Sequence, residues 1–351
     1  MERGDFMKKR MVAGALSMGM TLSLLFTGCG GGPGESENGS RELLNVSYDP
    51  TREFYVTYNE LFSEYWKEKT GEEIRITQSH GGSGSQARSV IEGNEADVVT
   101  LALAHDIMAI EDAGLIENGW MEELEKNSAP YTSTIVFLVR KGNEKGIQDW
   151  DDLVKEGVKV ITPNPKTSGG ACWNFLAAWA YEQKQNGGDE EATKAFMKKL
   201  YENVLVLDSG ARGATNTFVE NRQGDVLIAW ENEAYLSMEQ YPGEYEMVTP
   251  SISILAEPSV AVVDSNAKEH GTEELAKAYL EYLYSVDAQR LAGENYYRPS
   301  DEEIQKEFSQ QFNFDMELVT MDDFGGWKEA YDTYFDDSGV FDQIYDCKNN
   351  E

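Results

Sequence analysis

Residues 73–92 read EIRITQSHGGSGSQARSVIE, and they run from an apolar-rich stretch through a Ser/Gly turn into a helix-like segment. Residues 73–78 have the pattern of a β-strand and residues 86–92 that of a helix, with the turn at 79–84 between them. The backbone N–H groups of such a turn lie free at a helix N-terminus, where the peptide dipoles sum to roughly half a positive charge. The stretch therefore predicts a strand, a turn and a helix that can hold a small anion.

Two further turns repeat this arrangement. Residues 166–171 read KTSGGA and residues 208–213 read DSGARG, and each follows an apolar run and precedes a helix-like segment. A single turn of this kind is most often only a tight connection between a strand and a helix. Three at equivalent positions indicate one shared oxyanion site.

The chain alternates short β-rich runs with helical segments, which predicts an α/β fold with mostly parallel sheets covered by helices. In such folds ligands bind at the carboxyl ends of the strands, where all three turns lie. The expected strands are 43–48, 73–78, 98–103, 134–140, 158–162, 204–207, 226–230 and 259–263, and the expected helices are 52–70, 86–92, 170–185 and 190–203.

A length of 351 residues allows two lobes. The apolar runs TIVFLVR at 134–140 and SVAVV at 259–263 are candidate hinge strands, which makes the first lobe discontinuous. We expect lobe 1 to comprise 41–133 with 259–300, lobe 2 to comprise 134–258, and a C-terminal helical extension to follow at 301–351.

The N-terminus has the pattern of an export signal. Basic residues at 8–10 precede an apolar run at 11–26, which is shorter than the roughly 18–20 residues needed to span a bilayer. The run ends in LFTGC, which resembles the lipobox of bacterial lipoproteins and implies a signal peptide of 1–29 ending at a lipidated Cys29. Residues 30–40 are polar and Gly-rich and form a flexible tether. This predicts an extracytoplasmic protein, lipid-anchored to the bacterial membrane.

Composition and motifs exclude several classes of protein. With 63 acidic against 30 basic residues, the net charge of −33 argues against nucleic-acid binding. The scattered His and Cys residues predict neither a metal site nor a disulfide framework. A relaxed GxGxxA match at 82–87 lacks the acid that a dinucleotide site requires, and the P-loop and GxSxG motifs are absent from the sequence. We expect no cofactor and no catalytic residues.

Trp230 ends the apolar run 226–230 and so reaches the same edge as the turns. Its indole N–H is a donor without acceptor capacity, which suits an anion that carries no proton. A Trp that only covers the core remains the alternative on spacing alone.

Six segments together resemble the sulfate-binding proteins of ABC uptake systems, and the similarity runs over residues 43–327. They are LNVSYDPTR at 44–52, SHGGSG at 79–84 with ADVVTLA at 96–102, SAPYTST at 128–134, ITPNPKTSGG at 161–170, LDSGARG at 207–213 and IAWEN at 228–232. The resemblance implies a two-lobed periplasmic-binding-protein fold of type II that closes around its ligand, and an ABC permease as partner of a monomeric receptor.

The family's motifs also imply a ligand set. The implied donors are the backbone N–H groups of Ser83, Gly169, Gly170 and Ala211, the hydroxyl of Ser168 and the indole of Trp230. Asp49 matches a family aspartate expected to orient site peptides. Cys172 stands where the family commonly has Arg. Without that Arg, the N–H dipoles alone are expected to compensate the charge of the ligand.

The resemblance implies sulfate as the ligand. Thiosulfate, molybdate and tungstate are the alternatives within binding proteins, and an enzyme acting on a sulfo or phospho group is the alternative outside them. Phosphate often retains an O–H at neutral pH, which would face donors in an all-donor site, so we expect sulfate to be preferred.

Overall fold

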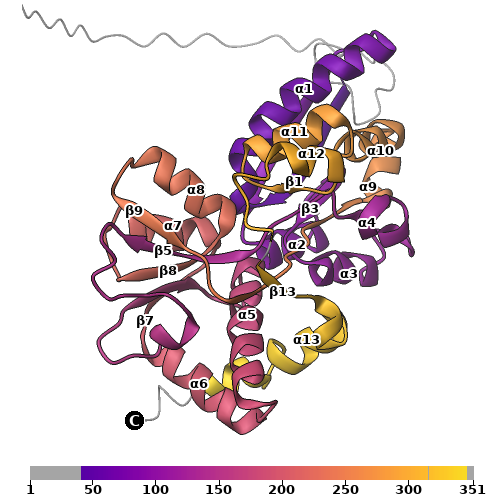
Figure 1. Ribbon diagram of the computed structural model, residues 1–351. Coiled ribbons are helices and arrows are strands. Elements are labelled where there is room, and N and C mark those ends of the chain that lie inside the picture. Colours follow the sequence, from indigo (N-terminus) through magenta and orange to yellow (C-terminus); the bar gives the residue numbers. More distant parts are fainter. Residues whose placement is uncertain (1–40, 315, 346–351) are drawn as a thin grey trace, which may run out of the picture. The chain divides into compact units, whose positions relative to one another are not determined.

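The computed structural model describes residues 41–314 and 316–345, so the predicted signal peptide, Cys29 and the tether lie outside the described residues. The first sheet, of which Figure 1 labels β1 and β3, has the strand order β11-β3-β1-β2. Its strands are β1 (Arg41–Tyr48), β2 (Ile74–Gly81), β3 (Val98–Leu101) and β11 (Ser259–Val262). β1 pairs in parallel with β2 and β3, whereas β11 is antiparallel to β3.

The second sheet has the order β7-β6-β8-β5-β9. Its strands are β5 (Ile135–Arg140), β6 (Val160–Pro163), β7 (Val204–Asp208), β8 (Val226–Trp230) and β9 (Tyr245–Val248). β6 is parallel to β7 and β8, and β5 is antiparallel to β8 and β9. Both sheets are thus mixed, which confirms the predicted α/β fold class.

Helices cover these sheets (Figure 1). They are α1 (Arg52–Thr70), α2 (Ser83–Ile91), α3 (Ala104–Asp112), α4 (Glu125–Ser128), α5 (Gly169–Asn186), α6 (Glu190–Glu202), α7 (Ala211–Val219), α8 (Glu231–Gln240), α9 (Asp264–His270), α10 (Glu273–Tyr282) and α11 (Val286–Glu294). Short 3-10 turns are η1 (Asp49–Thr51), η2 (Trp120–Glu122), η3 (Trp150–Asp152) and η4 (Met321–Phe324). Among the described residues, no helix is both long enough and apolar enough to cross a membrane.

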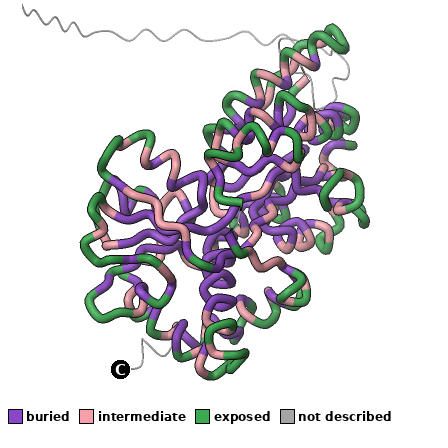
Figure 2. Tube along the Cα trace, in the orientation of Figure 1, coloured by how far each residue is buried: buried purple, intermediate pink, exposed green. Residues whose placement is uncertain are grey.

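α1 shows why the sequence patterns form these elements. Phe54, Tyr58, Phe62 and Trp66 recur every four residues and are buried, so one face of the helix packs inward. Gly71 ends the helix with a left-handed φ of 79°, a conformation that glycine adopts without steric cost. Figure 2 shows the corresponding layering, with buried residues concentrated along the strands and exposed residues on the outer helices.

The chain crosses between the two sheets at Ser133 and Ala256. Their backbones form an antiparallel bridge, in which each N–H donates to the other's carbonyl over 2.9 Å. The two candidate hinge strands correspond to β5 and β11, and each lies within a single sheet. The crossing therefore lies just before these strands rather than inside them.

The C-terminal extension contains α12 (Glu302–Glu307), β13 (Glu317–Val319), α13 (Trp327–Tyr334) and α14 (Val340–Tyr345). The extension is mostly helical, and its one described strand, β13, pairs in parallel with β10 (Ile252–Ile254). A strand of three residues is too short to show the alternation of apolar and polar residues that predicts a strand, and its pairing partner is distant in the sequence. Two more short strands, β4 (Tyr131–Thr132) and β12 (Arg298–Pro299), pair with each other.

Candidate anion-binding site

Three helices begin at one small cavity. α2 starts at Ser83, α5 at Gly169 and α7 at Ala211, each after the carboxyl end of a strand. Among the described residues no side chain caps any of these N-termini. The N–H groups of their first turns have no partner within their own helices, and the helix dipoles favour negative charge there. The arrangement is suited to holding a small anion.

Both sheets contribute to the cavity. It is lined by Tyr48, Asp49, Pro50, Gly81, Gly82, Ser83, Ala102, Ser168, Gly170, Ala211 and Trp230. The cavity has a volume of about 10 Å³. Such a space has no room for an organic molecule.

Glycine is required here by close packing. A Cβ added to Gly82 would lie 2.5 Å from the carbonyl oxygen of Thr167, and one added to Gly170 would lie 2.4 Å from Nε1 of Trp230. Real Cβ atoms do not approach other atoms so closely, so these positions have no room for a methyl group. Because Gly82 follows the first sheet and Thr167 the second, the contact brings the two sides of the cavity together.

Trp230 presents its indole N–H without a hydrogen-bond partner among the described residues, although the side chain is only 1% exposed. The ring packs at 5.5 Å from that of Tyr48. A buried donor without an acceptor costs about 1–3 kcal/mol, so an acceptor bound in the cavity would recover that cost.

Ser83 is held by its hydroxyl. Its Oγ donates to Oδ2 of Asp106 and accepts the backbone N–H of Ala102 at 3.0 Å. The hydroxyl is therefore engaged away from the helix end, and the predicted donor of this residue, its backbone N–H, is the group at the start of α2.

Ser168 and Asp49 both line the cavity. Ser168 is buried and its hydroxyl makes no capping bond to α5. Asp49 pairs through Oδ1 with Arg52 at 2.7 Å. Its other oxygen, Oδ2, faces Gly210, where an added Cβ would lie 2.7 Å away. Asp49 thus lies beside Gly210, the residue before Ala211, and its orienting role stays a prediction.

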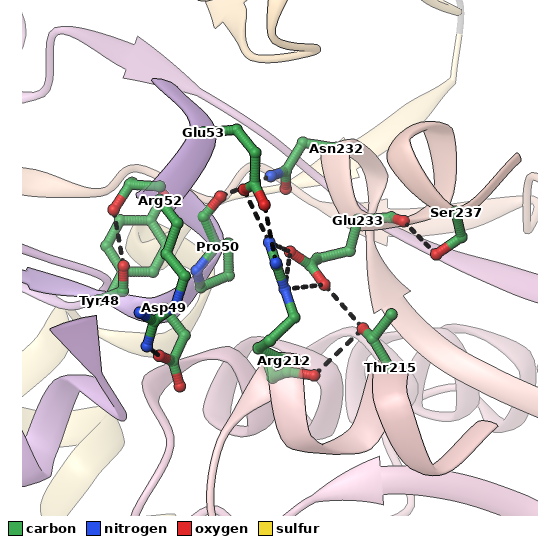
Figure 3. A network of polar contacts seen from close by, with 12 residues as sticks. Tyr48, Asp49, Pro50, Arg52, Glu53, Arg212, Thr215, Asn232, Glu233 and Ser237 are labelled. Atoms are coloured by element: carbon green, nitrogen blue, oxygen red, sulfur yellow. Dashed lines mark hydrogen bonds and ion pairs between the residues drawn. The ribbon is translucent and has the colours of Figure 1, made fainter. Parts of the chain in front are cut away.

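An ionic network joins α1 to α7 and α8 beside the cavity (Figure 3). The Arg212 guanidinium donates to both carboxylate oxygens of Glu53 at 2.8 Å and to Glu233 at 2.8–3.1 Å. Thr215 Oγ1 donates to Glu233 at 2.8 Å. Burial favours a higher pKa for Glu53, but the hydrogen bonds and the charge of Arg212 have the larger combined effect, so the pKa of Glu53 is lowered. At Glu233 burial dominates over Arg212 and raises the pKa.

No Lys or Arg lines the cavity within the described part of the chain, and Asp49 is the one carboxylate there. Cys172 is buried on α5, and its thiol donates to the carbonyl of Pro165 at 3.4 Å. Burial raises the pKa of this thiol well above its usual value, so it is neutral. The donors that face the cavity are therefore uncharged.

The structure brings the predicted site residues together. Six of them line the cavity, namely Asp49, Ser83, Ser168, Gly170, Ala211 and Trp230. Gly169 lies beside them, because an added Cβ would be 3.1 Å from Cβ of Ser83.

Sequence reasoning missed Asp106, Glu53 and Glu233. Asp106 follows β3 as the turns follow their strands, and this position could have pointed to it. No local pattern pairs Arg212 with Glu53, 159 positions away. Among the described residues no group of three His, Cys, Asp or Glu side chains is arranged to hold a metal ion.

Comparison with known proteins shows the family of this chain. Residues 52–298 match the family of bacterial extracellular solute-binding proteins. The sulfate-binding protein of Escherichia coli is 59% identical over 305 residues, which cover 86% of this chain and 92% of that protein. The thiosulfate-binding protein of Pseudomonas aeruginosa is 47% identical over 345 residues, or 97% and 99% of the two chains.

A solved structure shows the same fold. The sulfate-binding protein SubI from Mycobacterium tuberculosis superimposes with a TM-score of 0.75 at 32% identity, covering 84% of this chain and 99% of that one. This fold, with two mixed sheets that both contribute to one small cavity, is shared with a solute-binding protein of known structure. The chain belongs to the bacterial extracellular solute-binding proteins, in the family of the sulfate- and thiosulfate-binding proteins.

Proposed function

We propose that this chain captures sulfate in the cavity between its two sheets and delivers it to an ABC permease. The observation that carries the proposal is the convergence of three uncapped helix N-termini and the unpartnered indole of Trp230 on one small cavity. Sulfate is fully deprotonated at neutral pH and accepts hydrogen bonds only, which matches a set of donors. The names of the E. coli and M. tuberculosis relatives support the same ligand.

The proposed ligand donors are the backbone N–H groups of Ser83, Gly169, Gly170 and Ala211, the hydroxyl of Ser168 and the indole of Trp230, with Asp49 orienting the peptides around them. Preorganised N–H dipoles in a water-poor cavity compensate the ligand's charge without a cationic side chain.

Isothermal titration calorimetry with sulfate tests this proposal. Trp230→Phe removes the indole donor, and we expect its sulfate affinity to fall by about 10–100-fold, the usual effect of one hydrogen bond to a charged group. Trp179→Phe is the matched control, because Trp179 is a buried tryptophan of α5, also without a partner for its Nε1 among the described residues, but outside the cavity lining. No sulfate binding by the unmodified chain, or equal losses in both variants, would contradict the proposal.

Thiosulfate is the second candidate ligand, favoured by the P. aeruginosa relative that matches 97% of this chain. The same titration with thiosulfate and molybdate ranks these anions. An enzymatic role on a sulfo or phospho group predicts turnover of a sulfate ester, which a pure binding protein does not show.

We also propose how the receptor is organised. Lobe 1 (41–133 with 259–300) and lobe 2 (134–258) close on the anion about the crossing at Ser133 and Ala256. The chain acts as a monomer, anchored to the membrane through lipid on Cys29. Incorporation of labelled palmitate that is lost in Cys29→Ser would support the anchor, and unchanged incorporation would refute it.

A further inference from the structure

The indole of Trp173 forms a hydrogen bond between the two sides of the molecule, next to the wall of the anion cavity. Its Nε1 donates to the carbonyl oxygen of Ala102 at 3.0 Å, and the side chain is fully buried. Ala102 follows β3 of the first sheet and lines the cavity, whereas Trp173 belongs to α5, which packs on the second sheet. The bond therefore links residues that are held by different sheets.

The spacing of residues along α5 explains this bond. Gly169 and Trp173 are four residues apart, so both lie on one face of the helix. Gly169 leaves room for the end of β3, because an added Cβ would lie 2.9 Å from Cβ of Ala102 and 2.8 Å from Cγ of Leu103. One turn further along the helix, the indole of Trp173 reaches the carbonyl oxygen of Ala102. The helix that begins at the anion cavity thus also presents a donor to the first sheet.

Each partner of the bond is fixed on its own side. Asn174, the next residue of α5, donates through Nδ2 to the carbonyl oxygen of Ile228 in β8 at 3.2 Å, which holds α5 on the second sheet. The N–H of Ala102 donates to Oγ of Ser83 at 3.0 Å, which holds Ala102 beside the start of α2. A movement of the two sheets away from each other would therefore separate Nε1 of Trp173 from its acceptor.

Resting on the proposed closure of the two lobes on sulfate, we propose that Trp173 is a positioning residue that stabilises the closed receptor and slows the release of sulfate. In an open receptor water satisfies both the indole N–H and the carbonyl oxygen of Ala102, so the bond adds free energy to the closed form alone. A bond that forms after the anion has entered lowers the dissociation rate and leaves the association rate nearly unchanged. Trp173 is not among the described residues that line the cavity, so it acts through Ala102.

Stopped-flow tryptophan fluorescence of the full chain tests this role. Trp173→Phe removes the indole N–H and keeps an aromatic ring against Trp327 of α13, which packs edge-on against Trp173 at a centroid distance of 4.7 Å. We expect the dissociation rate of sulfate to rise about tenfold, as for the loss of one buried hydrogen bond, and the association rate to stay within about threefold. Trp230 remains in the variant as the fluorescent group at the cavity.

Trp150→Phe is the matched control. Trp150 is equally buried, and its Nε1 donates to the carbonyl oxygen of Ile252 at 2.8 Å. Both residues belong to the proposed lobe 2, so opening of the lobes leaves this bond intact, and the variant should lose stability against urea without a change in the dissociation rate of sulfate. Equal dissociation rates in Trp173→Phe and the unmodified chain, or equal increases in both variants, would overturn the inference. No sulfate binding by the unmodified chain would contradict the proposed function instead.

Exchange of indole protons with water in the unmodified chain decides the question if Trp173→Phe fails to fold. Nuclear magnetic resonance compares the indole protons of Trp173 and Trp150 in the same sample, with and without sulfate. Without sulfate, the Trp173 proton should exchange within seconds, because opening of the lobes exposes it, whereas the Trp150 proton should stay protected. With sulfate, both should be protected. A Trp173 proton that is equally protected without sulfate would overturn the inference.

Discussion

Single residues at the cavity are selected by space and by unsatisfied hydrogen-bonding groups. Gly170 has an ordinary negative φ, so its lack of a side chain answers a packing demand from Trp230 rather than a backbone one. Gly84, in the first turn of α2, has its nearest neighbours at an ordinary 3.5 Å. The two glycines thus differ in what a methyl group would displace.

Gly170→Ala should therefore displace the indole of Trp230 and lower sulfate affinity by at least about tenfold, the loss expected for one charged-ligand hydrogen bond. Gly84→Ala is the matched change at another helix start and should leave affinity within about threefold, since its contacts are ordinary. Calorimetric titration of both variants checks this. Equal affinities in Gly170→Ala and the unmodified chain would show that the indole position is unimportant.

Asp106 also predicts a pH-dependent stability difference. Its folded pKa is raised from 3.8 to about 6, so its contribution to folding is fully present below pH 3.8 and is lost as pH rises through about 6. Asp106→Asn avoids that loss, and its advantage in the free energy of unfolding should be roughly 1 kcal/mol larger at pH 7.5 than at pH 5. Urea unfolding at both pH values measures this, and an advantage that shrinks with pH would be inconsistent with a buried carboxylate.

The three turns and Trp230 were predictable from local signals, whereas the individual donors in the turns and Asp49 were implied only by the resemblance to the family. A Ser/Gly turn before a helix and a Trp at a strand end can each be read within ten residues. Asp106 and the Arg212 network were missed because their partners are distant in sequence, and burial that raises a carboxyl pKa exists only in the folded chain.

Among the secondary-structure elements, helix starts differ in whether a side chain caps them, and α9, α10 and α13 have no side-chain cap although they begin away from the cavity. Away from the cavity, α6, α11 and α12 begin with side-chain caps from Asp189, Ser285 and Asp301. The helices α2, α5 and α7 at the cavity have none. Omitting a cap costs about 1 kcal/mol per helix, a cost that a bound anion offsets.

The bounds of most elements were close to prediction, and α1 matched at both ends because Gly71 and the apolar face define it. β2 extends to Gly81 and α2 begins at Ser83, so the first turn is narrower than predicted. The strand ladder overrides the low β-propensity of glycine there, through pairing of Gly81 with Tyr48. This pairing depends on a neighbouring strand, so no pattern in the sequence around Gly81 predicts it.

The Arg212 network ties α1 to α7 and α8, and it should slow ligand release. Arg212→Met leaves Glu53 and the buried Glu233 without their ion-pair partner, and we expect the dissociation rate of sulfate to rise at least several-fold, since the loss of one partner leaves a buried carboxylate uncompensated. Arg222→Met is the control, because its ion pair with Glu244 is exposed and outside the network. Stopped-flow tryptophan fluorescence measures both rates, and similar rates in all three proteins would exclude this role.

In the molecule as a whole, both sheets contribute residues to one cavity. Ser83 follows the first sheet, whereas Ser168, Ala211 and Trp230 belong to the second. The acidic surface, at a net charge of −33, does not prevent anion capture, because exposed charges are screened beyond about 10 Å whereas N–H donors act at contact distance. In the proposed site, local dipoles would thus hold the anion against the net charge of the chain.

The central claim is that an all-donor cavity selects an oxyanion without a proton. Competitive calorimetric titration of sulfate against phosphate at pH 7.5 tests it most directly. A site built on donors alone can discriminate by about 10⁴ against a ligand group that it leaves unpaired, so we expect sulfate to bind at least about 10³-fold more tightly than phosphate. Phosphate binding within tenfold of sulfate would contradict the account.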